Sequence, residues 1–385
     1  MMKPLKSVLN VCVGIALCIV LYYVLLNSFQ IFRIMMFSEI NQNPEFNGSV
    51  DQSSDRYWME YYQQITKQNG IKAFTHAPIT NGTCHGKFHS NMNDNMQTVL
   101  DYPVVNKMAS QFKEMFELFG EPVVSGNETL PVIVTGASSN HYHESLAMIN
   151  TFKEKISLRY KGIKLIYYDL GLTRFQKREL HNFCNCEIRT FRFNKYPSFV
   201  RELRNFSWKT VIIYTVLKEH NFVMWADTSV KFTGTKEAYD VFFQQVKQVG
   251  ILVRKNNRSE TARTFYRTKE ETFKYLNEQS CMFDFKILGA GFITIWKTSF
   301  TWKYIIQPWL ACALTEHCMS HFDPGLIMFC DPKKEVLYHC HRFDQAVLSI
   351  ILQRLFNVNY DIVTLNRLPE VHQRDRSQRY FIKEV

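Results

Sequence analysis

One stretch of the sequence decides the fold: Asn221-Phe222-Val223-Met224-Trp225-Ala226-Asp227-Thr228-Ser229-Val230. Residues 222–226 are apolar and uncharged, which predicts one short strand buried on both faces. The strand ends in an acid and two hydroxyls, where a parallel strand would leave its sheet. Ligands of open α/β sheets bind just beyond the carboxyl ends of the strands. Asp227 could therefore hold a divalent cation and a phosphorylated substrate, or it could simply cap the turn or the next helix.

On both sides of this stretch, strand-like runs alternate with helical patterns. Thr173 has the position of an N-cap before one of the helices. We predict strands at 130–135, 163–168, 186–191 and 250–253, a glycine turn followed by a strand within 288–296, and helices at 105–119, 143–156, 174–180, 208–219, 239–249, 300–314 and 341–355. Such alternation favours an α/β fold with a mostly parallel, Rossmann-like sheet, right-handed crossovers and flanking helices.

The amino end carries an apolar run at residues 7–26, roughly the 20 residues that cross a bilayer as one helix. Lys3 and Lys6 precede it, which predicts a cytosolic tail at 1–6 and a luminal body. A cleaved signal peptide is the alternative, but the run is long for one and lacks a convincing cleavage site. We therefore expect a type II signal anchor in the Golgi or endoplasmic reticulum, a stem at 27–102 and a globular domain at 103–385.

Two features agree with a luminal body. Five Asn-x-Ser/Thr glycosylation acceptors follow the apolar run: Asn47, Asn81, Asn127, Asn205 and Asn257. Eight cysteines also follow it, an even number that suggests disulfides in an oxidising compartment, with a pairing that sequence cannot assign. A zinc site remains open for the Cys- and His-rich residues 312–341, although no CxxC pair occurs.

The composition limits the class of partner. The chain has 385 residues, of which 46% are hydrophobic, so it can bury a large core. Its net charge of +11 could suit nucleic acid, but a luminal location and the lack of a nucleic-acid motif argue against that partner. A basic luminal surface instead suits anionic substrates such as nucleotide-sugars.

An oxidoreductase is the first enzyme class to weigh. Thr135-Gly136-Ala137-Ser138-Ser139 imitates the opening of a short-chain dehydrogenase, and Tyr214 and Lys218 form a Tyr-x-x-x-Lys pair. A lysine four residues further on a helix can lower the pKa of a phenol. However, the glycine fingerprint stops after one glycine, and the Tyr-x-x-x-Lys pair comes too early to leave room for the intervening strands.

A glycosyltransferase is the second class, and here the chain resembles a known family. The order of a strand at 132–135, Tyr168-Asp169-Leu170-Gly171-Leu172, Trp208-Lys209 at a helix start and Trp225-Ala226-Asp227-Thr228-Ser229 is similar to that of a nematode-expanded family of type II membrane proteins. That family carries a domain of unknown function and resembles the nucleotide-diphospho-sugar transferases of the glycosyltransferase A fold. Gly289-Ala290-Gly291-Phe292, Pro308-Trp309 with Cys312-Ala313-Leu314, and Arg342-Phe343-Asp344-Gln345 extend the resemblance to about residue 355.

The resemblance implies a metal-assisted donor site. In the glycosyltransferase A fold, an Asp-x-Asp after the fourth strand binds Mn²⁺ or another divalent cation and, with it, the donor diphosphate. Asp227-Thr228-Ser229 takes this place with a serine as its last residue, and a hydroxyl is a weaker ligand for a hard cation. Either one carboxylate suffices, or Lys and Arg side chains neutralise the diphosphate without metal, or the protein is an inactive, membrane-tethered binding or scaffold protein.

The same resemblance assigns roles to the remaining candidates. Asp227 and Ser229 would hold the metal and the donor, with Thr135, Gly136 and Ala137 meeting the nucleotide. Asp344 and Arg342 would be catalytic, near the sugar or the acceptor, and Gly289 and Gly291 would shape the acceptor side. His339 and His341 are candidate metal ligands or bases, with ordinary surface or core histidines as the alternative. The expected partners are a nucleotide-sugar donor and a glycan or glycoprotein acceptor.

Overall fold

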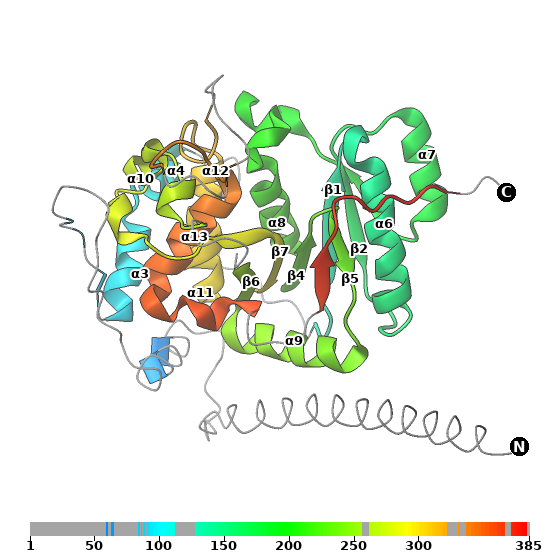
Figure 1. Ribbon diagram of the computed structural model, residues 1–385, viewed down its shortest axis with the longest axis horizontal. Helices are drawn as coiled ribbons and strands as arrows, with labels where there is room; N and C mark the ends of the chain where they lie inside the picture. Colours follow the sequence, from blue (N-terminus) through cyan, green and yellow to red (C-terminus); the bar gives the residue numbers. More distant parts are fainter. Residues whose placement is uncertain are drawn as a thin grey trace, which may run out of the picture. The chain divides into compact units, whose positions relative to one another are not determined.

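The computed structural model describes residues 59–60, 63–64, 84, 86, 88–89, 91–111, 128–255, 262–321, 330–331, 336–365 and 371–382 (Figure 1). The predicted anchor at 7–26 lies outside these residues, as do four of the predicted glycosylation sites, Asn47, Asn81, Asn127 and Asn257. Within the described ranges, no helix combines the length and the apolar character needed to cross a bilayer.

A six-stranded sheet in the order β3-β2-β1-β4-β7-β6 forms the centre of the described body. Its parallel part consists of β1 (Val132–Ala137), β2 (Leu165–Asp169), β3 (Glu187–Thr190) and β4 (Phe222–Ala226). Two antiparallel strands, β7 (Leu288–Trp296) and β6 (Ile251–Lys255), complete it beside β4. The predicted mostly parallel α/β sheet is confirmed, and β4 has the predicted bounds.

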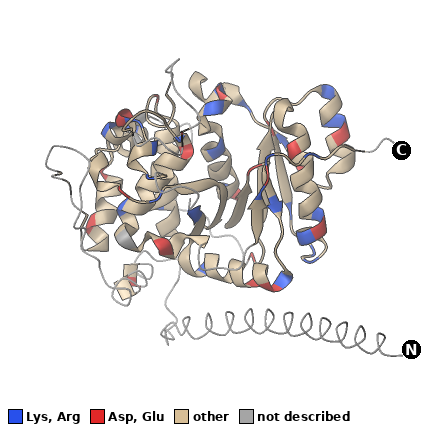
Figure 2. Ribbon diagram, viewed as in Figure 1, with Lys and Arg blue, Asp and Glu red and all other residues tan. Residues whose placement is uncertain are grey.

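Both faces of the sheet are buried, because alternate residues of each strand point to opposite sides. Met224 belongs to the core on one face, whereas Val223 and Trp225 belong to the core on the other. The first core contains side chains of α6 (Tyr142–Phe152), α7 (Arg174–Phe183) and α9 (Lys236–Val249). The second contains side chains of α8 (Ser207–Glu219), α12 (Gln307–Ala313) and α13 (Phe343–Phe356). Figure 2 shows charged residues on the helices, whereas β1 and β4 carry none.

Local signals explain several helix boundaries. Thr173 caps α7 in a full capping box with Gln176, as its position predicts. The predicted helix at 300–314 is instead interrupted: a short α11 (Ser299–Thr301) is followed by a π-helical turn at Trp302–Ile306 and then by α12. Pro308 lies in the first turn of α12, where a residue without an N–H is tolerated, so the regular helix restarts there.

The body begins earlier in the chain than predicted. Residues expected in the stem form α3 (Met92–Leu100), whose Met92, Met96 and Val99 lie in the core next to α4 (Pro103–Gln111). Tyr102 donates a hydrogen bond of 2.8 Å to buried Glu278. A disulfide joins Cys84 to the body, so the stem cannot extend to residue 102.

All eight cysteines of the body are paired in disulfides: Cys84–Cys281, Cys184–Cys186, Cys312–Cys318 and Cys330–Cys340. The prediction of a disulfide-bonded body therefore holds. The zinc alternative at 312–341 loses its thiolate ligands, because the four cysteines of that stretch are used in the last two bridges.

A second, two-stranded sheet brings the end of the described chain to the candidate site. β5 (Val230–Phe232) follows directly after Asp227-Thr228-Ser229, and β8 (His372–Arg374) pairs with it in antiparallel orientation. The register places Arg374 opposite Val230. Figure 1 shows β8 in red beside β5, with the following segment passing along α6. The remaining helix, α10 (Glu270–Tyr275), packs away from the sheet through Phe273.

Candidate functional site

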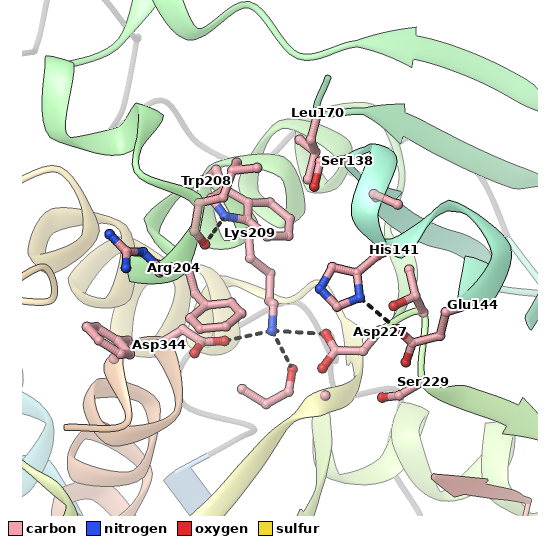
Figure 3. A pocket seen from close by; sticks show the side chains of 18 of the residues that line it. Ser138, His141, Glu144, Leu170, Arg204, Trp208, Lys209, Asp227, Ser229 and Asp344 are labelled. Atoms are coloured by element: carbon pink, nitrogen blue, oxygen red, sulfur yellow. Dashed lines mark hydrogen bonds and ion pairs between the residues drawn. The ribbon is translucent and has the colours of Figure 1, made fainter. Parts of the chain in front are cut away.

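A cavity of about 460 Å³ lies at the carboxyl ends of β1 and β4 (Figure 3). Its walls come from the ends of those strands, the starts of α6, α8 and α13, the middle of β7, and the segment that includes β8. This is where an open α/β sheet holds its ligand. Of the candidates named from the sequence, Gly136, Ala137, Asp227, Ser229, Gly291, His341, Arg342 and Asp344 line the cavity.

Lys209 holds two of the candidate carboxylates together. Its ammonium nitrogen lies 3.0 Å from Oδ1 of Asp227 and 2.9 Å from Oδ2 of Asp344, and it donates to the carbonyl of Ala290 at 3.3 Å. The Lys209 side chain is 3% exposed. α8 and α13 begin at Ser207 and Phe343, so the starts of two helices far apart in the sequence meet at this lysine.

The protonation states follow from this arrangement. Burial by itself would raise the pKa of Asp227, but the Lys209 ammonium and the Arg374 guanidinium hold it below its usual value. Burial alone would lower the pKa of Lys209, but the charges of Asp227 and Asp344 outweigh the effect of burial, so the pKa is raised. Burial raises the pKa of Asp344, and the negative charge of Asp227 adds to this rise. Lys209 opposes the rise without cancelling it. Lys209 is therefore a structural cation, and Asp344 is the more basic carboxylate.

Strained backbone positions flank this ion pair. Phe206, which precedes α8, has φ = 57°, and Phe343, the first residue of α13, has φ = 44°. The two rings lie 6.0 Å apart, and both line the cavity. A left-handed conformation costs a residue with a side chain about 1–2 kcal/mol. The two rings pack against each other at the helix starts that carry Lys209 and Asp344.

Arg374 lies between the two predicted metal ligands. Its Nε and Nη2 donate to Oγ of Ser229 at 3.1 and 3.0 Å, and Nη2 also donates to Oδ2 of Asp227 at 3.2 Å. Gly291 makes room for this contact, since a Cβ there would lie 2.8 Å from Oδ2 of Asp227 and 3.0 Å from the guanidinium carbon. The absence of a side chain at Gly291 thus leaves the space in which the Arg374 guanidinium contacts Asp227.

The cavity is basic overall. Arg342 donates to Oε1 of Gln345 at 3.1 Å, and burial, together with nearby arginines, lowers its pKa from the usual arginine value. Six basic side chains line the cavity against three acidic ones: Arg204, Lys209, Arg342, Arg374, Arg376 and Arg379, and Glu144, Asp227 and Asp344. Such an excess of fixed positive charge attracts an anion.

A histidine–carboxylate pair lies on the opposite wall. Nδ1 of His141 is 2.7 Å from Oε2 of Glu144, and Figure 3 shows both side chains at the cavity. The Glu144 side chain is 4% exposed and that of His141 is 55% exposed. A buried carboxylate that fixes an accessible imidazole can orient it toward a ligand.

Thr135 and Gly289 lie outside the cavity lining, and His341 contributes to its wall only as a buried residue. Thr135 is buried within β1, one residue before the cavity wall, and Gly289 faces Arg254 of β6 rather than the cavity. His341 is buried, with its Nε2 3.0 Å from the carbonyl of Met319 and its Nδ1 accepting from the backbone of Lys269. Burial and nearby His321 hold its pKa well below the usual value, which is the core-histidine alternative.

One predicted glycosylation site and the dehydrogenase-like pair, already disfavoured from the sequence, do not fit the structure. Asn205 is 3% exposed, so its side chain has no room for a glycan in this fold. Tyr214, the phenol of the dehydrogenase-like pair, is buried and stacks on Trp302 at 4.9 Å, away from the cavity lining. The oxidoreductase reading therefore lacks its catalytic tyrosine at this site.

The sequence analysis gave no role to Lys209, His141, Glu144 or Arg374. Lys209 stands in the Trp208-Lys209 pair at a predicted helix start, but nothing nearby in the sequence shows its two partners. The basic end had a signal in Arg374, Arg376 and Arg379, spaced two and three residues apart. This spacing does not predict a site by itself, because only the pairing of β8 with β5 brings the arginines to the cavity.

The residues present do not fit the predicted divalent cation. Among the described residues, no group of three or more His, Cys, Asp or Glu side chains is placed to hold a metal ion. Each oxygen of Asp227 already contacts a basic side chain, and the Ser229 hydroxyl accepts from Arg374. A cation would need oxygen ligands at about 2.0–2.6 Å in the place that the guanidinium takes.

Comparison with known proteins gives one partial family match and several weak structural likenesses. The family model "Protein of unknown function (DUF1647)" matches residues 84–214, which is 131 of the chain's 385 residues. This agrees with a body that begins near Cys84. No curated protein is significantly similar to the chain in sequence.

Solved structures of glycosyltransferases resemble the fold. The mannosyltransferase Ktr4p from S. cerevisiae has 12% identity and a TM-score of 0.39, with 76% of this chain and 80% of that chain covered. The Mn/GDP form of core-mannan synthase A from Aspergillus fumigatus has 8% identity and a TM-score of 0.37, with 77% and 81% covered. WbbM, a bifunctional glycosyltransferase, has 13% identity and a TM-score of 0.36. The match covers 62% of this chain but only 39% of WbbM. These identities and scores are too low to transfer a substrate, a metal or an activity.

Proposed function

We propose that this protein binds a nucleotide-diphospho-sugar in the cavity and transfers the sugar to a hydroxyl group of a glycan, protein or lipid acceptor. The observation that carries the proposal is one cavity at the carboxyl ends of β1 and β4 in which basic side chains and carboxylates face the same space. Its volume of about 460 Å³ lies in the range of small-molecule sites. Basic groups would hold the diphosphate, and a carboxylate would serve the acceptor.

The reaction needs two kinds of group. The anomeric carbon exchanges its bond to a diphosphate oxygen for a bond to the acceptor oxygen, and the bonding electrons leave with the diphosphate. The positive charges of Arg342 and its neighbouring arginines stabilise the negative charge that develops on the diphosphate. The acceptor proton passes to Asp344, whose raised pKa makes it a stronger base than an ordinary carboxylate. We thus retain Asp344 and Arg342 as the proposed catalytic residues.

A second candidate function is a binding or scaffold protein that holds a nucleotide-sugar or its product without catalysis. The observation that favours it is Lys209, which contacts both Asp227 and Asp344 and neutralises the carboxylates that catalysis would use. An anion could still bind to the arginines of such a site.

The two functions differ in nucleotide release. The full chain, purified in detergent, would be incubated with a panel of UDP- and GDP-sugars, and the free nucleoside diphosphate would be measured. Transfer or slow hydrolysis releases nucleotide from one donor, and Asp344→Asn should lower that rate about 100-fold or more, the usual scale for a general base. Asp240→Asn changes an exposed carboxylate outside the cavity and should leave the rate unchanged.

Donor binding without release would favour the scaffold function. If no nucleotide or nucleotide-sugar binds at all, both functions are wrong.

We further propose that the body is luminal, anchored by residues 7–26 as a type II membrane protein of the Golgi or endoplasmic reticulum. The paired cysteines support an oxidising compartment. Expression in a eukaryotic secretory host and treatment with an N-glycosidase should increase gel mobility through Asn47, Asn81, Asn127 or Asn257. Unchanged mobility would contradict the luminal orientation.

A further inference from the structure

We infer that the donor diphosphate binds to this protein without a divalent cation, because Arg374 takes the position between Asp227 and Ser229 that a metal ion would take. The inference rests on the proposed function, since it concerns the same cavity and the same anionic donor.

Arg374 is fixed by its surroundings on both sides. β8 pairs with β5, which places Arg374 opposite Val230, and the backbone N–H of Asp375 donates to the carbonyl of Ser229 at 2.9 Å. The guanidinium then makes three hydrogen bonds to Ser229 and Asp227. Strand pairing therefore fixes the backbone of Arg374, and these hydrogen bonds hold its guanidinium beside Asp227 and Ser229.

Both carboxylate oxygens of Asp227 are already engaged by basic side chains in this arrangement. Oδ1 accepts from Nε1 of Trp225 at 2.9 Å and lies 3.0 Å from the Lys209 ammonium, and Oδ2 accepts from Arg374. Lys209 is buried and also tied to Asp344, so it cannot move aside without leaving a buried charge unpaired. A divalent cation at Asp227 would face two fixed positive charges.

The remaining basic side chains supply the charge that a metal would bring. When Lys209 and Arg374 are set against Asp227 and Asp344, the lining still holds Arg204, Arg342, Arg376 and Arg379 against Glu144 alone. Burial lowers the pKa of Arg342, and nearby arginines add to that shift, so a bound anion would stabilise its charged form. Guanidinium groups bind phosphate oxygens through paired, charge-assisted hydrogen bonds. The site is thus suited to a nucleoside diphosphate group.

The test measures binding and needs no acceptor. UDP and GDP are titrated into the full chain by calorimetry, once with EDTA and once with Mn²⁺. We expect one of the two nucleotides to bind with a Kd that differs by less than about threefold between the two conditions. Arg374→Gln and, separately, Arg342→Gln should each weaken the binding in EDTA by about tenfold or more, the scale of a charge-assisted hydrogen bond.

The controls separate this inference from the proposed function. Arg178→Gln removes an exposed arginine of α7 that does not line the cavity, and it should bind like the wild type. Arg374→Lys keeps the positive charge but loses the bidentate geometry of the guanidinium. If this variant has the melting temperature of the wild type and binds nucleotide more weakly, a folding defect is excluded as the cause. Binding that requires Mn²⁺ and disappears in EDTA would overturn the inference and leave the proposed function standing. If neither nucleotide binds in either condition, both are overturned.

Discussion

Lys209 is the residue that joins the separate parts of the site. A buried ion pair contributes little net stability when compared with an apolar replacement of both partners, but removing only one partner leaves an unpaired buried charge. At this site one lysine balances Asp227 from β4 and Asp344 from α13. Its loss would leave the two carboxylates facing each other without the ammonium between them.

We predict that Lys209→Met lowers the free energy of unfolding by about 3–5 kcal/mol, as for other broken buried pairs. The matched control is Lys236→Met, which removes a lysine that pairs with Asp240 at the surface of α9, with both side chains about half exposed. Lys236→Met should lower the free energy of unfolding by less than about 0.5 kcal/mol. Urea unfolding of both variants near pH 7 measures the difference. Equal costs would show that Lys209 is not held as a buried cation.

Lys231 gives a prediction about pH. It is 1% exposed and donates to the carbonyl of Thr228 at 2.8 Å, and burial lowers its pKa from 10.5 to about 8. Glu144 and Asp375 oppose the shift, and Arg379 adds to it. Between these two values the unfolded chain holds the proton and the folded chain does not, so the free energy of unfolding should rise with pH.

Lys231→Met removes this titration. The wild-type free energy of unfolding minus that of Lys231→Met should be flat below about pH 8 and should rise by roughly 2–3 kcal/mol up to about pH 10. Urea unfolding at a series of pH values measures the difference. A difference that falls with pH over this range would contradict the burial of a neutral lysine.

At the scale of single elements, β7 carries two glycines with different neighbours. The sequence analysis treated Gly289 and Gly291 as one feature, a glycine turn that shapes the acceptor side. Both lie instead within one continuous strand, and only Gly291 faces Asp227 and Arg374. A Cβ at Gly289 would meet the backbone carbonyl of Arg254 at 3.2 Å, on the neighbouring strand.

This difference makes a matched pair of variants. We predict that Gly291→Ala displaces the Arg374 guanidinium and weakens the binding of UDP or GDP by about tenfold, which corresponds to roughly 1.4 kcal/mol. Gly289→Ala should leave nucleotide binding unchanged and should alter the free energy of unfolding by no more than about 1 kcal/mol. Calorimetric titration and urea unfolding of both variants check the two statements. Loss of binding in Gly289→Ala would mean that the strand as a whole, rather than Gly291, shapes the site.

At the scale of the whole body, one disulfide closes a long loop and another closes a very short one. Cys84–Cys281 joins residues 197 positions apart and ties the start of the body to the segment after α10, whereas Cys184–Cys186 joins residues two positions apart. A disulfide restricts the unfolded chain more when it closes a longer loop. The first bridge should therefore matter far more for stability.

We predict that replacing Cys84 and Cys281 by serine lowers the free energy of unfolding by up to about 5 kcal/mol, and that the same change at Cys184 and Cys186 lowers it by less than about 2 kcal/mol. Chemical unfolding under non-reducing conditions measures both. Similar effects of the two double variants would indicate that residues 84–102 do not fold as part of the body.

Local sequence patterns predict the α/β class, the buried strand β4, the N-cap at Thr173 and the position of Asp227 and Ser229 just beyond a strand end. These predictions follow from local apolar periodicity, from N-cap preferences and from the rule that parallel strands end at one edge. Arg342 and Asp344 are named only through the family resemblance. Only the folded structure shows which charged side chains contact one another at the site. Lys209 and Asp344 lie 135 residues apart in the sequence, and Asp227 and Arg374 lie 147 residues apart. No local pattern encodes such distant contacts, because they arise from helix starts and strand pairing that only the folded chain brings together.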